Sequence, residues 1–248
     1  MTRQDIVQPY VGQYLGTFWS FVNPLVIIVL YAVVFEFVFR FRTNLLDGFE
    51  DSNYTQFLLS ALIPWLGFVE VLTRSNGDIT GNANLVKKVI FPTIVLPVRT
   101  ALSAGFKSML GFVFLSIVLV VQLGRIPLSF ALFPVAALIT LVYMVGAAWF
   151  LAALTPFFRD LSNLMTIFVT AGIYVSPIIY PGDPPPVLGP FIDLNPFGYP
   201  LLMYRDIFHH HGIETPSAWL ISAAFALVTF VVGYSLFNRL RPHFSTVL

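Results

Sequence analysis

The stretch Thr73–Pro97 most constrains how this chain can fold, because it is polar and separates two long apolar runs. The run before it ends in Leu58–Leu72, and the run after it continues to Leu123. A polar segment of this length cannot lie in hydrocarbon, where each unpaired backbone group costs several kcal/mol. We therefore expect Thr73–Pro97 to be a loop in water between two membrane-spanning helices.

This loop carries the signals of a short helix of its own. Asn82 or Asn84 is a suitable N-cap, and the amphipathic segment Leu85–Ile90 is followed by Phe91-Pro92, which ends a helix. A short helix held between two spans is a rigid contact on which another protein can push. The alternative interpretation is a solvated connector without a partner.

The composition indicates a membrane protein. Apolar residues make up 57% of the chain and charged residues 10%, against about 25% charged residues in soluble domains. The chain has no Cys, which excludes disulfides and thiol chemistry, and its net charge of +1 does not indicate an acidic partner. The first apolar run lacks a small-residue cleavage site, so we expect a retained signal anchor.

Hydropathy predicts an all-α integral membrane protein that forms a single transmembrane domain over residues 1–248. The segment before the first span is too polar to cross the membrane, and its apolar stripe favours a helix lying in the interface. Six transmembrane helices are expected, at about 18–39, 57–72, 102–123, 129–154, 161–180 and 218–240. The stretch 181–216 is too apolar for a free loop, and we expect re-entrant or surface-lying helices there.

The distribution of Lys and Arg predicts the orientation of these spans. A cytoplasmic N-terminus places most of the basic residues inside: Arg3, Arg74, Lys87, Lys88, Arg99, Arg159, Arg239 and Arg241. The outer side then holds Arg40, Arg42, Arg125 and Arg205. We therefore expect both termini and the polar loop in the cytoplasm, and the stretch 181–216 outside.

Short motifs along nearly the whole chain resemble those of one family. Tyr14–Trp19 with Asn23–Leu25 is similar to the opening of type 2 ABC exporter permeases for polysaccharides. Asn82–Pro92 with Leu96-Pro97 is similar to that family's loop between its second and third helices. Later segments match further landmarks of the family: Arg159-Asp160-Leu161, Ser176–Pro181, Asn195-Pro196 and Arg205-Asp206.

The resemblance implies a transport subunit that works as a homodimer with two separate ATPase subunits. It implies a coupling helix on the cytoplasmic loop between spans 2 and 3, and export of a lipid-linked glycan such as O-antigen or a teichoic acid precursor across the bacterial cytoplasmic (inner) membrane. It places ATPase docking at Asn82, Asn84, Leu85, Lys87, Lys88, Val89 and Phe91, with Arg159 at a secondary contact.

The chain has no phosphate-binding loop of its own. The segment Gly105-Phe106-Lys107-Ser108 lacks the first glycine of that motif and sits in an apolar span. We therefore expect no catalytic, cofactor or metal site in this chain, and ATP and Mg to act through the partner subunit.

Charged residues within the predicted spans do not favour ion-coupled transport. Glu36 precedes Arg40, and Glu70 precedes Arg74, at the spacing of a favourable helical ion pair. We expect paired charges near the membrane interface. Lys107 is placed to extend its ammonium group toward water, and its functional alternative is a contact with a lipid phosphate. No predicted span carries the series of Asp, Glu and His that a proton relay requires.

Aromatic residues give a candidate path for a glycan. Tyr31, Phe35 and Phe39 recur every four residues, so they form one stripe of the first span. Sugar rings stack their C–H faces on aromatic rings, although ordinary lipid-facing or helix-packing aromatics are the alternative. His209-His210-His211 is expected to be a solvated helix end rather than a metal site, because adjacent residues point in different directions around a helix.

Two other function classes fit part of the sequence. One is a permease of the same superfamily that exports a drug or small lipid. The other is an integral-membrane enzyme acting on lipid-linked sugars, for which the candidate carboxylates are Asp47, Glu50 and Asp51.

Overall fold

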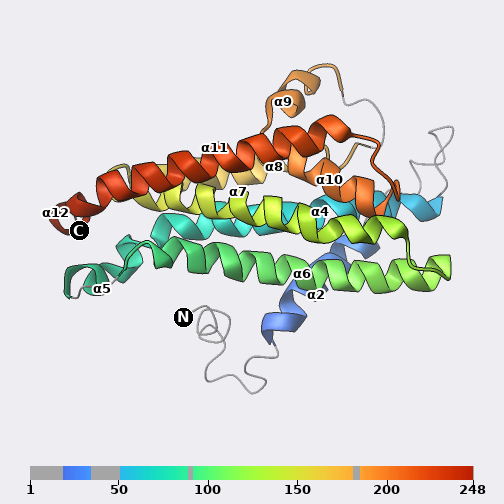
Figure 1. Ribbon diagram of the computed structural model, residues 1–248, viewed down its shortest axis with the longest axis horizontal. Helices are drawn as coiled ribbons and strands as arrows, with labels where there is room; N and C mark the ends of the chain where they lie inside the picture. The colour runs from blue at the N-terminus through green and yellow to red at the C-terminus, as the bar shows by residue number, and fades with distance from the viewer. Residues whose placement is uncertain (1–18, 35–50, 89–91, 181–184, 248) are drawn as a thin grey trace.

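The computed structural model describes residues 19–34, 51–88, 92–180 and 185–247, and these ranges are mainly helical (Figure 1). The longer helices are α2 (Trp19–Val34), α4 (Asp51–Arg74), α6 (Val95–Leu123), α7 (Phe133–Leu154) and α11 (Pro216–Leu240). The shorter ones are α5 (Ala83–Lys88), α8 (Leu161–Gly172), α9 (Gly189–Leu194), α10 (Gly198–Phe208) and α12 (Phe244–Val247). Short 3₁₀ helices are η4 (Ser75–Gly77), η5 (Thr80–Asn82), η6 (Leu128–Leu132) and η7 (Arg241–His243). The all-α prediction is confirmed for this part of the chain.

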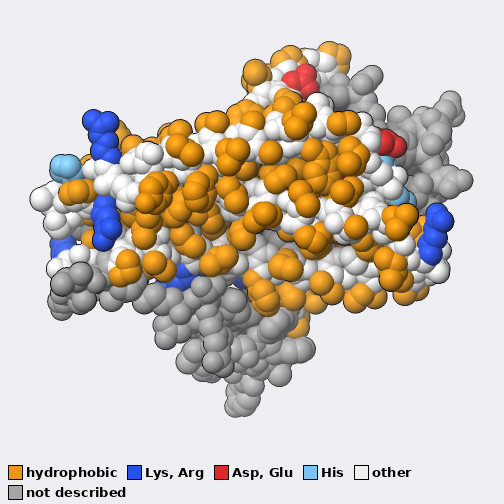
Figure 2. Space-filling view, in the orientation of Figure 1, with side chains coloured by type: hydrophobic (Ala, Val, Ile, Leu, Met, Phe, Trp, Pro, Cys, Tyr) orange, Lys and Arg blue, Asp and Glu red, His pale blue; other side chains and the backbone are white. Residues whose placement is uncertain are grey.

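Helix α4 lies at the centre of the bundle. Its apolar window is 78% buried, against 28% for that of α6 and 22% for that of α11. It contacts α6, α7, α8 and α10. The outer helices instead expose apolar side chains, and Figure 2 shows such side chains covering the middle of the molecule. A continuous apolar surface of this kind is covered by lipid or by another protein.

Helices α7 and α11 pack with their backbones in contact. A Cβ atom built on Gly233 would lie 2.2 Å from the carbonyl oxygen of Gly146, and one built on Gly146 would lie 2.5 Å from the backbone nitrogen of Phe230. Small residues permit this close approach, which is a main source of helix association in membranes.

Four helical segments are long and apolar enough to cross a membrane: Tyr54–Gly77, Val95–Leu123, Leu128–Leu154 and Pro216–Val247. They correspond to the predicted second, third, fourth and sixth spans. Of the predicted first span, the structure describes Trp19–Val34 as helix, and the rest lies outside the described residues. The six-span count therefore stays a prediction.

The predicted fifth span is represented by a short helix. Helix α8 has 12 residues and ends at Gly172, which gives about 18 Å at 1.5 Å per residue, against a hydrocarbon core of about 30 Å. A Cβ on Gly172 would lie 2.3 Å from the Trp65 ring, so α8 presses closely on α4 at the point where it ends. A continuous helix over 161–180, as we expected, is not observed.

The third span begins earlier than predicted. We expected its start at about residue 102, but α6 begins at Val95. Pro97 lies in the first turn of α6, where the missing N–H costs no helical hydrogen bond. The proline that we interpreted as part of the loop is therefore part of the helix start.

The two ends of the bundle carry different elements (Figure 1). Helices α5 and α12 and the turn from α7 to α8 lie at one end, which we call the α5 end. The turn from α6 to α7 and the linker from α10 to α11 lie at the other. The elements predicted to be cytoplasmic thus share one end, and those predicted to be outside share the opposite one.

Candidate functional site

The loop between α4 and α6, residues 75–94, is fastened to the bundle. Asn76 is 4% exposed, and its Nδ2 donates to the carbonyl oxygen of Leu72 at 2.6 Å. The hydroxyl group of Thr155 lies 3.1 Å from Oδ1 of Asn76 and donates to it. Thr155 is the C-cap of α7, so these bonds hold the ends of α4 and α7 together.

Two further contacts tie the α4–α6 loop to α6 and α7. Asp78 is 6% exposed, and its Oδ1 accepts a hydrogen bond from the hydroxyl of Thr100 at 2.8 Å. Trp149 of α7 donates its indole N–H to the carbonyl oxygen of Ile94 at 3.0 Å. Buried carboxylates and carbonyls need such donors. The loop is therefore held near both of its ends and is not a free connector.

Helix α5 is the short helix that the sequence predicted in this loop. Val86 packs against a core shared by α4, α6, α7 and α11, whereas Asn84 and Lys87 are exposed. The side chain of Asn82 donates to the carbonyl oxygen of Asp78 at 2.9 Å. The other predicted docking residues have side chains outside the described part of the structure: Leu85, Lys88, Val89 and Phe91.

A cleft of about 500 Å³, the α5 cleft, opens beside this helix. The α4–α6 loop contributes Gly77 and Thr80 to it, and Ala83 of α5 continues the same wall. The turn from α7 to α8 contributes Arg159, and α12 contributes Val247. The structure thus places Arg159, the predicted secondary contact, in one cleft with the predicted docking loop.

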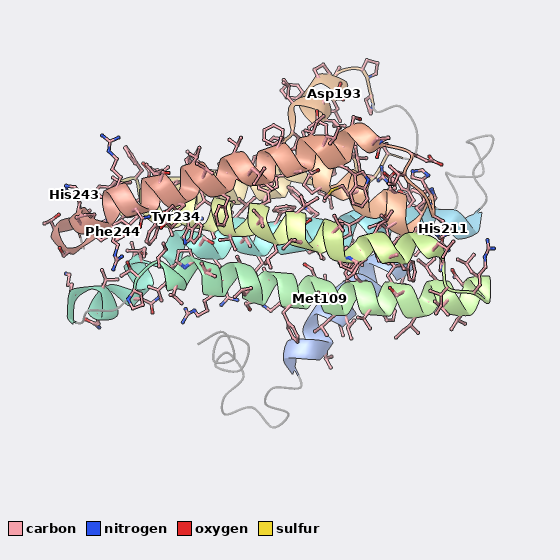
Figure 3. The ribbon with its side chains drawn as sticks, in the orientation of Figure 1. Met109, Asp193, His211, Tyr234, His243 and Phe244 are labelled. Atoms are coloured by element: carbon pink, nitrogen blue, oxygen red, sulfur yellow. The ribbon has the colours of Figure 1, made fainter. Side chains whose placement is uncertain are left out.

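Helix α12 is a part of this cleft that the sequence analysis missed. Phe244 is 0% exposed, and its ring lies 5.4 Å from that of Phe237 and 6.3 Å from that of Phe157 (Figure 3). These contacts hold α12 against the bundle, where it also contacts α5. The available signal was the single aromatic residue, Phe244, in the short segment after α11.

The carboxylate of Glu70 joins two cations. Its Oε1 lies 2.7 Å from a guanidinium nitrogen of Arg74 and 2.6 Å from Nζ of Lys107. The predicted pair of Glu70 and Arg74 is confirmed, and the Lys107 ammonium group meets a protein carboxylate as well. One carboxylate between two cations leaves the cluster with a net positive charge. The predicted pair of Glu36 and Arg40 lies outside the described residues.

Of the predicted aromatic stripe, Tyr31 is described, whereas Phe35 and Phe39 lie outside the described residues. Tyr31 is half-buried and packs against the core that α4 forms with α6 and α10. The structure also shows a hydroxyl stripe on α8 that we did not predict. Thr166 and Thr170 are exposed, and each hydroxyl donates to the backbone carbonyl four residues earlier.

At the opposite end, α10 is buried and held by its two charged residues. Asp206 is 0% exposed, and its Oδ2 accepts hydrogen bonds from the Thr215 N–H at 3.2 Å, the Thr215 hydroxyl at 3.0 Å and the Trp219 indole at 2.9 Å. The guanidinium carbon of Arg205 lies 3.6 Å from the centre of the Phe57 ring. The Arg205-Asp206 motif therefore holds α10 between α4 and α11.

The Asn195-Pro196 motif joins the same region. Nδ2 of Asn195 donates to the carbonyl oxygen of Val175 at 3.0 Å and to Oγ of Ser176 at 2.8 Å. Its Oδ1 accepts the N–H of Phe197 at 3.1 Å, in the turn before α10. Asn195 follows α9, and α10 begins at Gly198.

The three adjacent histidines are more closely packed than we expected. His209 lies edge-on to Phe57 with ring centres 5.4 Å apart, and His210 contacts Glu214 at 3.0 Å. Burial, with smaller contributions from the neighbouring His210 and Arg205, lowers the pKa of His209 to about 4. The expected solvated helix end is therefore wrong for His209. Among the described residues, no group of three or more His, Asp or Glu is arranged to hold a metal ion.

The sequence as a whole matches a known family. The family model described as ABC-2 type transporter matches residues 1–209. The chain belongs to the ABC-2 type transporter family. A Klebsiella pneumoniae protein named O-antigen export system permease protein RfbA is 29% identical to this permease over 251 residues, which is 100% of this chain and 93% of the relative. A Myxococcus xanthus protein of the same name is 27% identical over 249 residues, which is 99% of this chain and 92% of the relative.

Family membership establishes the class of the chain. An ABC-2 permease is the transmembrane subunit of an ATP-driven transporter, and such subunits lack the ATPase domain. The permease is therefore a multi-pass transport subunit rather than an enzyme, and it requires an ABC ATPase as its partner.

Proposed function

We propose that this permease forms a homodimer, binds two ATPase subunits and exports a lipid-linked polysaccharide, O-antigen or a related glycan, across the bacterial cytoplasmic membrane. The substrate is supported by the relatives, which are named O-antigen export permeases and are matched over 92% or more of their length. No comparable observation favours a drug or a small lipid.

The observation that carries the coupling mechanism is the fastening of the α4–α6 loop. Hydrogen bonds from Thr155, Thr100 and Trp149 tie this loop to α7 and α6. A force applied to α5 therefore displaces the ends of the membrane helices and is not absorbed by a free loop. We assign ATPase docking to the predicted residues: Asn82, Asn84, Leu85, Lys87, Lys88, Val89, Phe91 and Arg159.

We place the α5 end in the cytoplasm. Figure 2 shows most of the visible Lys and Arg side chains toward this end, whereas the opposite end carries Asp and Glu side chains together with Lys or Arg. Exposed basic residues at the α5 end include Arg74, Lys87, Arg159, Arg239 and Arg241. The excess of positive charge on cytoplasmic loops then orients the permease, with six spans in one domain and α9 and α10 as outer re-entrant helices.

The glycan path is assigned to surfaces that offer many weak and similar contacts. Tyr31, Phe35 and Phe39 provide aromatic faces, and the hydroxyl stripe on α8 provides polar contacts at membrane depth, where an exposed hydroxyl favours water or protein over lipid. We assign Lys107 as a contact for a lipid phosphate group. Glu70 holds its ammonium group in a cluster with Arg74, and this cluster carries a net positive charge.

The coupling role is tested by purifying the tagged permease from its native membrane and measuring the recovered ATPase and the glycan displayed on cells. Leu85→Asp should abolish both, because a desolvated apolar anchor contributes more to docking than a charge at the rim. Lys87→Ala should have a smaller effect, since exposed ion pairs contribute about 0–1 kcal/mol. Gly189→Asp is the control, because Gly189 lies on α9, outside the assigned docking residues, and a Cβ there meets nothing within 4 Å. Normal recovery and display with Leu85→Asp would reduce this loop to a connector.

The orientation is tested with single cysteines, since the chain has none of its own. Glu214→Cys should react with an impermeant thiol reagent added to intact cells, and Thr80→Cys should react only after the membrane is opened. Both positions are exposed and lie at opposite ends of the bundle. The reverse pattern would invert the assigned orientation.

A further inference from the structure

The α5 cleft has the form of a site that receives part of another protein. Its floor is fixed, because Asn76 and Thr155 are buried and hydrogen-bonded to each other. Its walls come from three segments that are far apart in the sequence: the α4–α6 loop, the turn from α7 to α8, and α12. Its volume of about 500 Å³ is within the range of about 300–1,000 Å³ found for sites that enclose a ligand.

The chemistry of the lining indicates what the cleft would accept. Thr80 and Ser162 provide hydroxyl groups, Ala83 and Val247 provide apolar surface, and Arg159 is the charged residue of the lining. Further exposed cations at the same end are Lys87, Arg239 and Arg241. Asp160, next to Arg159, is an exposed carboxylate there, so the surroundings are predominantly positive. A complementary segment carries a carboxylate for Arg159 beside a small apolar side chain.

We propose that this cleft receives an acidic loop or helix end of the ATPase subunit. The inference rests on the proposed docking of the ATPase at α5. The cleft is continuous with that surface, because Ala83 is the first residue of α5 and α12 contacts α5. A partner seated on α5 therefore also covers the cleft. The contact is then two-way: α5 lies on the ATPase, and a segment of the ATPase inserts between α5, α12 and the start of α8.

Two glycines of the same loop provide a matched test. A Cβ on Gly77 or on Gly81 meets nothing within 4 Å, so a side chain can begin at either position without displacing a neighbouring atom. Of the two, Gly77 lines the cleft. Gly77→Trp should lower the ATPase recovered with the permease by about tenfold, the effect expected from obstructing the centre of an interface. Gly81→Trp, which is next to the docking residue Asn82 but does not line the cleft, should lower recovery less than Gly77→Trp.

Both variants should match the unsubstituted permease in size-exclusion profile and thermal unfolding. Unchanged recovery with Gly77→Trp would overturn the proposal. An equal loss with both variants would also overturn it, because the effect would then arise from added bulk anywhere on the loop.

Crosslinking separates failure of this inference from failure of the proposed docking. A photoreactive maleimide is attached to Gly77→Cys in the cleft or to Lys87→Cys on α5, with Glu214→Cys as the negative control. Crosslinks to the ATPase from both positions support the two-way contact. A crosslink from Lys87→Cys alone overturns the cleft and keeps the docking, and none from either position overturns both. The peptide joined to Gly77→Cys should contain Asp or Glu; a peptide without a carboxylate would overturn the assigned chemistry.

Discussion

The hydroxyl group of Thr100 donates a hydrogen bond to Oδ1 of Asp78 across 2.8 Å, and both residues are buried. Thr100 lies in the second turn of α6, and Asp78 lies in the α4–α6 loop. The bond therefore connects the loop that we assign to the ATPase directly to a membrane-spanning helix.

Replacing Thr100 by Val should loosen this connection. The buried carboxylate of Asp78 would lose a donor, which costs about 1–3 kcal/mol. We expect a lower melting temperature and less glycan export for each ATP hydrolysed by the reconstituted complex. Thr100→Ser keeps the hydroxyl group and should retain coupling. If Thr100→Val couples as well as Thr100→Ser, the bond has no role in transmission.

Replacing Asp206 by Ala should release the linker between α10 and α11. Its Oδ2 accepts three hydrogen bonds, two of them from Thr215 and one from Trp219. The loss of hydrogen bonds to a charged group should lower the unfolding free energy by about 1.5–3 kcal/mol. Limited proteolysis of the purified permease should then cut the linker faster. Asp193→Ala is the control, because Asp193 is exposed on α9 (Figure 3); equal cleavage of both variants would contradict the anchoring role.

The end of the bundle opposite the α5 end should lose stability in acid. The pKa of His209 falls from 6.5 to about 4 in the folded chain, chiefly because the ring is buried, and His210, Arg205 and His211 lower it further. The folded state therefore holds His209 neutral, whereas the unfolded chain takes up a proton below about pH 6.5. The stabilisation is complete above that pH and is lost as the pH falls toward 4.

The measurement for His209 is thermal unfolding of the purified permease across this pH range. His209→Gln should flatten the decline in melting temperature between pH 6.5 and 4. His243→Gln alters an exposed histidine at the α5 end (Figure 3) and should leave the decline as it is. Identical acid profiles for His209→Gln and the unsubstituted chain would rule out this source of pH dependence.

Replacing Gly233 by Ala should force α7 and α11 apart. The added Cβ would lie 2.2 Å from the carbonyl oxygen of Gly146, and overpacking of this kind costs about 1–3 kcal/mol. We expect a lower melting temperature and a lower yield of folded protein. Gly189→Ala is the comparison, since a Cβ there meets nothing within 4 Å. A melting temperature equal to that of Gly189→Ala would show that the two helices adjust without cost.

The short helix α5 in the α4–α6 loop was predictable, because a polar segment between two apolar runs is a strong local signal. Its attachment was not predictable, since Thr155 and Asn76 are 79 positions apart and meet only in the folded chain. The same applies to the α5 cleft. Arg159 could be assigned from a motif, but Val247 becomes part of the site only because Phe244 packs against Phe157 and Phe237.

Hydropathy misjudged where the helix of the predicted fifth span ends, for a related reason. The sequence stays apolar from Leu161 to Tyr180, so a window of average hydropathy continues the helix. In the structure α8 ends at Gly172, which contacts the Trp65 ring of α4, and turns follow around Ser176 and Pro177. The contact with α4 decides where α8 ends, and an average of hydropathy over neighbouring residues carries no information about that contact.

The backbone contact between Gly146 and Gly233 also limits which parts of the permease can move. Helices whose main chains touch cannot slide or rotate past each other without separating, so we expect α7 and α11 to move as one rigid body. Helix α8 is short and joins α7 through the exposed residues Phe158, Arg159 and Asp160. The hinge of the transport cycle is then expected at this turn, where Arg159 also lines the α5 cleft. A small displacement by the ATPase at that point would act at the base of a lever and swing the far end of α8 through a larger arc.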